Sequence, residues 1–410
     1  MFRKIHPIML LPVILLFLQC SQTKVTPSPE SKVPQFGAAE QKMAEASNEF
    51  AFDIFEETAV ANGHNNLMIS PLSISYALGM TYNGANGTTE EAMRDMLAYG
   101  DLTDQEVNES YWNLTQMLTQ LDPLVVFEIA NSIWYRTGFQ VEQEFIDINQ
   151  EYFDARVSDI DFSKNSACDI MNGWIADKTH NKIREVIECP IDPLTMMFLI
   201  NAIYFNASWR FEFDPDSTRL QKFYLSDGST VMRDMMWQEN AFRMLYEDDF
   251  CAVDLPYGDS SFSMTLFLPA YGKTIDDLIP LFNQESWQIW MNSFIIDSTN
   301  LYLPKFKFGY GDTLNNELVN LGMGIAFSGG ADFTGINKDG GLFISKVIHK
   351  THIQVDEKGT EASAVTVVEM TMGPGSSVRL NKPFLFVIHD SYTGAILFMG
   401  IVEDPIWEEG

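Results

Sequence analysis

Histidine and cysteine side chains, which carry much of the chemistry of enzymes and metal sites, are few and scattered in this chain. His349 and His352 stand three residues apart in an apolar, β-branched stretch. Side chains three apart on a strand point to opposite faces, so we expect structural roles rather than a shared metal ion. The chain also lacks a G-x-S-x-G elbow, a phosphate-cradling glycine loop and an H-E-x-x-H helix. We therefore expect neither an enzyme nor a cofactor, with a hydrolase built on unrecognised carboxylates as a remote alternative.

The charge balance of the chain is strongly acidic. It has 26 Lys and Arg against 56 Asp and Glu, a net charge of −30. Such a surface repels nucleic acid and anionic membranes. Hydrophobic residues make up 46% of the chain, which is enough for a sizeable core. We expect a globular monomer with no nucleic-acid partner.

The first residues have the three-part pattern of an export signal. Arg3 and Lys4 precede an apolar run at 7–18, and Cys20 follows the run closely. A cysteine at this point resembles a bacterial lipoprotein signal, although Gln19 departs from the usual small residue before it. We expect a signal peptide at 1–19, a lipidated Cys20 with a polar tether to residue 37, and a membrane-anchored periplasmic or cell-surface protein. The alternative is a plain signal peptide, cut a few residues later, and an extracellular protein.

Helices are predicted for the first third of the chain and strands for the rest. Met43, Ala46, Phe50 and Ile54 mark one face of a helix that ends at Asn62-Gly63. Further helix starts are predicted at three signals: Ser70-Pro71, Thr88 with Glu91, and Thr103 with Glu106.

Apolar and β-branched runs predict strands at 125–135, 262–268, 301–309 and 342–355, and a hairpin over 384–402. The run at 262–268 alternates, which is typical of a half-buried strand. Helices followed by strands, without βαβ alternation, predict one α+β domain over 38–410 with mainly antiparallel sheets.

The stretch 356–384, "DEKGTEASAVTVVEMTMGPGSSVRLNKPF", combines two kinds of sequence. Its middle is small and β-branched like a strand, whereas Met-Gly-Pro-Gly-Ser-Ser is typical of an exposed loop.

Eight segments of the chain resemble the serpin family, in order and over nearly all of residues 38–405. They lie at 65–80, 127–162, 172–183, 198–214, 301–308, 321–336, 349–364 and 381–405. The resemblance implies the serpin fold, with three mainly antiparallel sheets, eight to nine helices and a reactive loop at about 357–380. It also implies suicide inhibition of serine proteases, with cysteine proteases as a second target class: the protease cuts the loop, and the loop then inserts into the large sheet and traps the acyl-enzyme.

The family's hinge, the first part of this loop, has the composition that insertion needs. A segment that joins the middle of a sheet cannot contain proline, and 358–373 contains none. Glu361 and Glu369 fall on the same face, which leaves the other face small or apolar. The hinge residues are Glu357, Gly359, Thr360, Glu361, Ala362, Ser363 and Ala364. Non-inhibitory members, which act as binding or carrier proteins and are the alternative function, usually carry a charge, proline or bulky group here.

The scissile bond is predicted between Met372 and Gly373. Counting along the family pattern from either end gives Met372 or Gly373 as the residue before the bond, and Pro374 makes a poor leaving group after Gly373. A flexible apolar Met suits elastase-like or chymotrypsin-like proteases. No Arg or Lys lies between residues 358 and 379, which argues against trypsin-like targets. Cleavage elsewhere within 370–374 stays open, as does the identity of the protease.

The resemblance also assigns residues that control the opening of the sheet. Ser70, Ser73, Asn201 and His349 match a polar cluster beneath the sheet centre, Trp209 matches the tryptophan where insertion begins, and Lys305 pairs with Glu357. A buried polar cluster must be hydrogen-bonded, whereas an exposed ion pair would contribute only about 0–1 kcal/mol. One disulfide among Cys168, Cys189 and Cys251 stays open.

Overall fold

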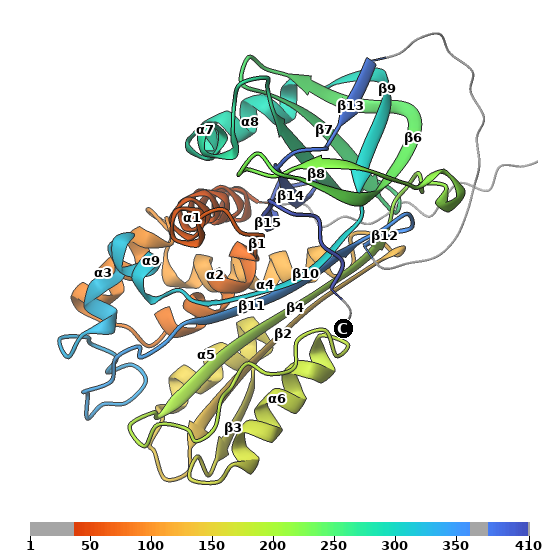
Figure 1. Ribbon diagram of the computed structural model, residues 1–410. Helices are drawn as coiled ribbons and strands as arrows, with labels where there is room; N and C mark the ends of the chain where they lie inside the picture. The colour runs from red at the N-terminus through yellow and green to blue at the C-terminus, as the bar shows by residue number, and fades with distance from the viewer. Residues whose placement is uncertain (1–36, 361–375, 409–410) are drawn as a thin grey trace, which may run out of the picture. The chain divides into compact units, whose positions relative to one another are not determined.

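The computed structural model describes residues 37–360 and 376–408 (Figure 1). They lie within one compact unit, Pro34–Gly410. The described residues form nine α-helices and three sheets, which confirms the predicted α+β class. The helices are α1 Ala38–Asn62, α2 Pro71–Tyr82, α3 Gly87–Met96, α4 Asp104–Leu118, α5 Gln143–Phe153, α6 Ser166–Lys178, α7 Ile275–Leu278, α8 Gln284–Ser293 and α9 Asn315–Asn320. None of these helices is long and apolar enough to cross a membrane.

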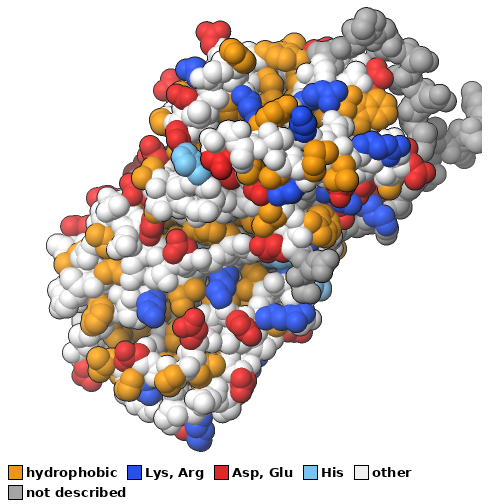
Figure 2. Space-filling view, in the orientation of Figure 1, with side chains coloured by type: hydrophobic (Ala, Val, Ile, Leu, Met, Phe, Trp, Pro, Cys, Tyr) orange, Lys and Arg blue, Asp and Glu red, His pale blue; other side chains and the backbone are white. Residues whose placement is uncertain are grey.

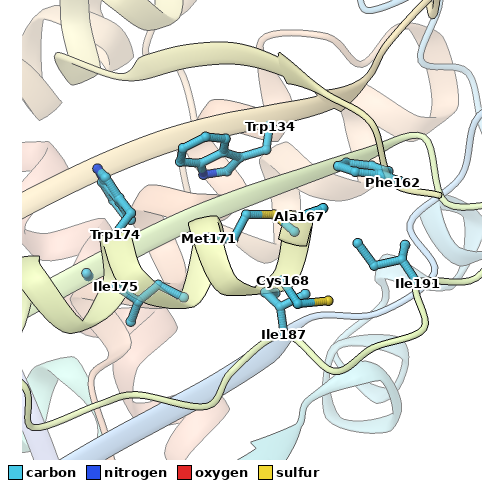
Figure 3. Packing of buried hydrophobic residues seen from close by; sticks show 10 residues of the cluster. Trp134, Phe162, Ala167, Cys168, Met171, Trp174, Ile175, Ile187 and Ile191 are labelled. Carbon is cyan, nitrogen blue, oxygen red and sulfur yellow. The ribbon is translucent and has the colours of Figure 1, made fainter. Parts of the chain in front are cut away.

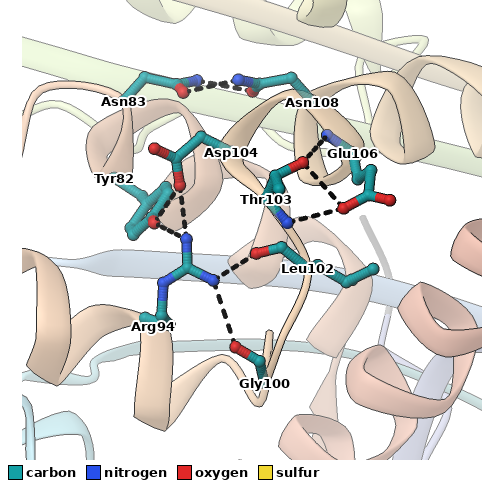
Figure 4. Close-up of polar contacts among 9 residues, drawn as sticks. All are labelled: Tyr82, Asn83, Arg94, Gly100, Leu102, Thr103, Asp104, Glu106 and Asn108. Atoms are coloured by element: carbon teal, nitrogen blue, oxygen red, sulfur yellow. Dashed lines mark hydrogen bonds and ion pairs between the residues drawn. The ribbon is translucent and has the colours of Figure 1, made fainter.

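Two of the three predicted helix caps are confirmed. The Ser70 hydroxyl accepts from the Ser73 amide at the start of α2, and Thr103 forms a capping box with Glu106 at the start of α4 (Figure 4). The predicted start at Thr88 is wrong. The Asn86 carbonyl already accepts from the amides of residues 89 and 90, so α3 begins at Gly87.

The strands form three sheets. The largest has the order β1-β15-β14-β8-β7-β6-β9-β13, with β5 paired to β6, and the others are β12-β4-β2-β3 and β10-β11. The strands are β1 Leu67–Ile69, β2 Val125–Arg136, β3 Arg156–Ile160, β4 Met197–Ser208, β5 Arg219–Tyr224, β6 Thr230–Tyr246, β7 Phe250–Tyr257, β8 Phe262–Pro269, β9 Ile295–Pro304, β10 Phe306–Thr313, β11 Ile348–Val355, β12 Gly359–Thr360, β13 Ser376–Arg379, β14 Phe384–Asp390 and β15 Ile396–Val402. Only β2–β3 and β9–β13 pair in parallel among the described strands.

Three strand predictions need correction. The run at 301–309, predicted as one strand, is divided between β9, which ends at Pro304, and β10, which begins at Phe306 and belongs to another sheet. β8 is buried on both faces rather than half-buried, because each face packs against aromatic side chains: Phe267 contacts Phe282 and Trp290, and Phe262, on the opposite face, contacts Phe127 and Phe205. The strand predicted at 342–355 begins only at Ile348. The Asn315 amide group of α9 donates to the Ser345 carbonyl and accepts from the Val347 amide, so it takes backbone groups that a strand would use.

β4 and β11 belong to different sheets, and no strand pairing joins them among the described residues. Both strands contact the short strand β12, and Figure 1 shows them running close together. Helix α2 packs against β4. We call the space between β4 and β11 the interval. The short strand β12 lies at one end of it, and the candidate site is built around β12.

Helix α6 packs onto β2 and β4 through a buried apolar cluster that includes Trp134, Met171 and Ile187 (Figure 3). The segment that leaves α6 is fastened to the helix by a disulfide between Cys168 and Cys189, with Cα atoms 6.1 Å apart. This resolves the pairing that the sequence leaves open, and Cys251 is the free cysteine among the described residues.

Candidate functional site

The start of the hinge is already paired with β4. A turn at residues 356–358 reverses the chain after β11, with the Asp356 amide donating to the Gly359 carbonyl at 3.1 Å. Strand β12 then runs antiparallel to β4, with Gly359 opposite Ser208 and Thr360 opposite Ala207. Two residues of the segment predicted to insert therefore occupy a strand position beside β4.

Glycine is required at position 359 by its surroundings. Its φ is +143°, which side-chain-bearing residues rarely adopt. A Cβ atom there would lie 2.3 Å from the Ala207 carbonyl oxygen and 2.7 Å from the Ser208 Cα. Any larger residue would push the chain away from β4, so Gly359 permits the close approach on which β12 depends.

Thr360 is buried, and its hydroxyl lies 2.9 Å from the Tyr257 hydroxyl. Burial raises the pKa of Tyr257 well above its ordinary value, so this phenol stays neutral and can share a hydrogen bond. The place that Thr360 fills accepts a small polar side chain, and a long charged one would be buried without a partner.

Trp209 holds the turn through two hydrogen bonds. Its indole Nε1 donates to the Asp356 carbonyl at 3.0 Å, and its backbone amide donates to the Lys358 carbonyl at 2.8 Å. The ring stacks on Tyr257, with centroids 4.5 Å apart and planes 11° from parallel. The predicted tryptophan therefore lies where β12 begins.

Glu357 fixes the turn through its carboxylate. Its carboxylate receives the Lys305 ammonium at 2.8 Å and the Thr218 hydroxyl at 2.7 Å. Burial alone would raise the pKa of Glu357, but the hydrogen bonds from Lys305 and Thr218 hold it below its ordinary value. The structure thus brings the predicted pair together, and the pair is not exposed: the Glu357 side chain is 11% accessible and that of Lys305 is 25% accessible.

The predicted polar cluster lies at the start of α2. The Ser70 amide donates to His349 Nε2 on β11 at 3.0 Å, and the Ser73 hydroxyl donates to Asn201 Oδ1 on β4 at 2.5 Å. Burial lowers the pKa of His349 from 6.5 to about 4, so the imidazole is neutral at pH 7 and its Nε2 can accept. One helix start therefore hydrogen-bonds to the strands on both sides of the interval.

Three residues of this arrangement are absent from the sequence prediction. Asn131 on β2 accepts from the Asn201 side-chain amide at 2.8 Å and extends the polar cluster, whereas Tyr257 and Thr218 contact the hinge. Asn131 stands out as a polar residue in an apolar strand run, which is a usable signal. Nothing local distinguishes Tyr257 or Thr218, because their contacts are long-range.

The remaining predicted site residues lie outside the described residues. These are Cys20, Glu361, Ala362, Ser363, Ala364, Met372 and Gly373.

On the face that Figure 2 shows, Lys and Arg side chains are interspersed with Asp and Glu.

Comparison with known proteins identifies the family. The chain matches the family model described as "Serpin (serine protease inhibitor)" over residues 45–405. An uncharacterized serpin-like protein of Methanosarcina acetivorans is 32% identical over 395 residues, covering 93% of this chain and 92% of the relative. Human neuroserpin is 31% identical over 377 residues, covering 88% of this chain and 91% of the relative. The chain therefore belongs to the serpin family.

The fold is confirmed by a solved structure. The crystal structure of human thyroxine-binding globulin complexed with thyroxine matches with a TM-score of 0.83 at 27% identity, covering 90% of this chain and 100% of that chain. Serpins are typically protease inhibitors rather than enzymes, and they are mostly secreted.

Proposed function

We propose that this serpin is a suicide inhibitor of elastase-like or chymotrypsin-like serine proteases, with cysteine proteases as a second target class. The observation that carries the proposal is β12: Gly359 and Thr360 are paired with β4, while the rest of the interval between β4 and β11 has no strand pairing. A segment that has begun to pair with β4 at one end can continue to pair along β4 once its other end is released.

The covalent step would take place at the bond between Met372 and Gly373. The hydroxyl of the protease serine adds to the Met372 carbonyl carbon, the amide bond to Gly373 breaks, and the new amino group of Gly373 leaves with the proton. An ester then joins Met372 to the protease. Insertion of the freed strand beside β4 would carry the protease away before water can hydrolyse the ester.

A carrier function without inhibition is disfavoured by the hinge. Thyroxine-binding globulin, solved as a complex with thyroxine, shares the fold. In this chain, however, Thr360 fills a small buried place and Gly359 lies against β4 backbone. These residues suit strand insertion, which a carrier does not need.

The test compares wild type with Thr360→Arg and Thr360→Ser after incubation with elastase-like and chymotrypsin-like proteases. We expect an SDS-stable complex for wild type and Thr360→Ser, with mass spectrometry placing the cut after Met372. Thr360→Arg should be cleaved without forming the complex, because its charge would be buried without a partner at the position beside β4 from which insertion must continue. Cleavage of wild type with full recovery of protease activity would refute inhibition, and a persistent complex with Thr360→Arg would refute the insertion mechanism.

We further propose that the chain is exported and held at a membrane by a lipid on Cys20. The support is the charged, apolar and cysteine pattern of residues 1–20. In cells that make the full chain, Cys20→Ser should move the protein from the membrane fraction to the soluble fraction. Equal membrane association of both forms would contradict lipidation.

A further inference from the structure

The backbone of residues 404–408 hydrogen-bonds to the edge of strand β10. The Lys307 amide donates to the Ile406 carbonyl at 2.8 Å, and the Glu408 amide donates back to the Lys307 carbonyl at 3.0 Å. Glu408 Oε2 also accepts from the Gly309 amide at 3.0 Å. The segment is anchored at its start by a two-pronged ion pair, in which Arg233 donates to both oxygens of Asp404.

This pairing places the Trp407 ring against two ammonium groups. Lys305 Nζ lies 5.1 Å from the ring centroid and Lys307 Nζ lies 5.9 Å from it. The two lysines are two residues apart in extended chain and so share one side. An aromatic face attracts a cation and also excludes water from one side of it, which strengthens the other interactions of that cation.

Lys305 is the point of contact with the hinge. Its ammonium meets the Trp407 ring and also the Glu357 carboxylate, at 2.8 Å. Glu357 in turn holds the 356–358 turn, since its carbonyl accepts from the Phe213 amide at 2.8 Å. A chain of contacts therefore runs from Trp407 through Lys305 to Glu357, which belongs to the turn that precedes β12.

We propose that Trp407 is a positioning residue for the hinge, which holds the Lys305 ammonium against Glu357 and thereby fixes the 356–358 turn from which β12 starts. A lysine has four rotatable side-chain bonds, and a stacked ring restricts them. Loss of the ring would free the ammonium, loosen the turn and slow insertion beyond β12. The consequence for inhibition depends on the proposed function, whereas the effect on the turn does not.

The first measurement needs no protease. The backbone amides of Trp209 and Phe213 both donate to carbonyls of the turn, so their hydrogen exchange reports how firmly the turn is held. We expect Trp407→Ala to speed their exchange about threefold, in line with a cation–π contact of modest strength. Trp407→Phe keeps an aromatic face and should exchange like wild type. So should Trp112→Ala, a control at an α4 position that is 38% exposed.

The second measurement asks whether Trp407 acts through Lys305. In a Lys305→Met background, Trp407→Ala should cause no further increase in exchange. In the otherwise wild-type chain, Trp407→Ala should raise the number of inhibitor molecules consumed per protease molecule about threefold, because slower insertion favours release of the cleaved inhibitor. Unchanged exchange in Trp407→Ala, or an equal increase in the Lys305→Met background, would overturn the proposal. Absence of any complex with wild type would instead refute the proposed function and leave the exchange result valid.

Discussion

The disulfide between Cys168 and Cys189 should contribute a few kcal/mol to the stability of the native protein. It closes a loop with a sequence separation of 21 residues between α6 and the segment that leads to β4. The chain-entropy relation gives about 11 cal/mol/K for such a loop, or about 3 kcal/mol at 25 °C. For a domain of this size, that corresponds to a loss of roughly 4 °C in the midpoint of thermal unfolding.

The assay compares thermal scans, at one fixed rate, of oxidised wild type, reduced wild type and the double variant Cys168→Ala/Cys189→Ala. Reduced wild type keeps the packing of both sulfur atoms, so it isolates the effect of the bond. Cys251→Ala under oxidising and reducing conditions is the matched control, since this variant keeps the disulfide and should lose the same amount on reduction.

Two results would refute this reasoning. If alkylation of the unfolded, unreduced protein labelled both Cys168 and Cys189, the bond would not exist in the protein. If reduction left the unfolding midpoint within about 1 °C of the oxidised value, the segment after α6 would be equally ordered without the bond, contrary to the magnitude above.

Two further predictions concern the polar cluster and the hinge. Burial lowers the pKa of His349 from 6.5 to about 4, so below pH 6.5 this histidine is protonated in the unfolded chain but stays neutral in the folded protein. The free energy of unfolding should therefore fall by roughly 3 kcal/mol from this group as the pH falls from 6.5 to 4. Denaturant titrations over this pH range measure the fall, and His349→Gln should reduce it. Gly359→Ala would bring a Cβ to 2.3 Å from the Ala207 carbonyl, so it should cost about 1–3 kcal/mol and detach β12, seen as faster hydrogen exchange of the β12 amides. Gly329→Ala, where no atom lies within 4 Å, is its control, and equal exchange in both variants would contradict the close approach.

The arrangement of helices and strands could be predicted where the signals are local. The helix at 38–62 has a periodic apolar face, and Thr103 with Glu106 caps α4 as expected. The start of β11 could not be predicted from 342–347, because Asn315 from a distant helix takes the backbone groups of that segment. Local propensity cannot predict a side chain that is distant in sequence and takes the backbone hydrogen bonds of a strand only after folding.

The same limit applies to the site. Small residues after Glu357 indicate a segment able to insert, but only the structure shows that Gly359 and Thr360 are already paired with β4. The resemblance supplied Lys305 as the partner of Glu357. The burial of this pair depends on surrounding residues that no motif contains, and so does its contact with Trp407.

The register of β12 on β4 fixes which residue of the following segment would lie opposite each residue of β4 if that segment inserted. Gly359 lies opposite Ser208 and Thr360 opposite Ala207, so each pair of opposite residues sums to 567. β4 has 12 residues and begins at Met197, and β12 runs antiparallel to it, so an insertion that kept this register would place residue 370 opposite Met197. A cut after Met372 would free a strand long enough to fill every position along β4. A cut several residues earlier would free too short a strand. Under the proposed mechanism, the length of β4 would therefore limit which proteases form a lasting complex.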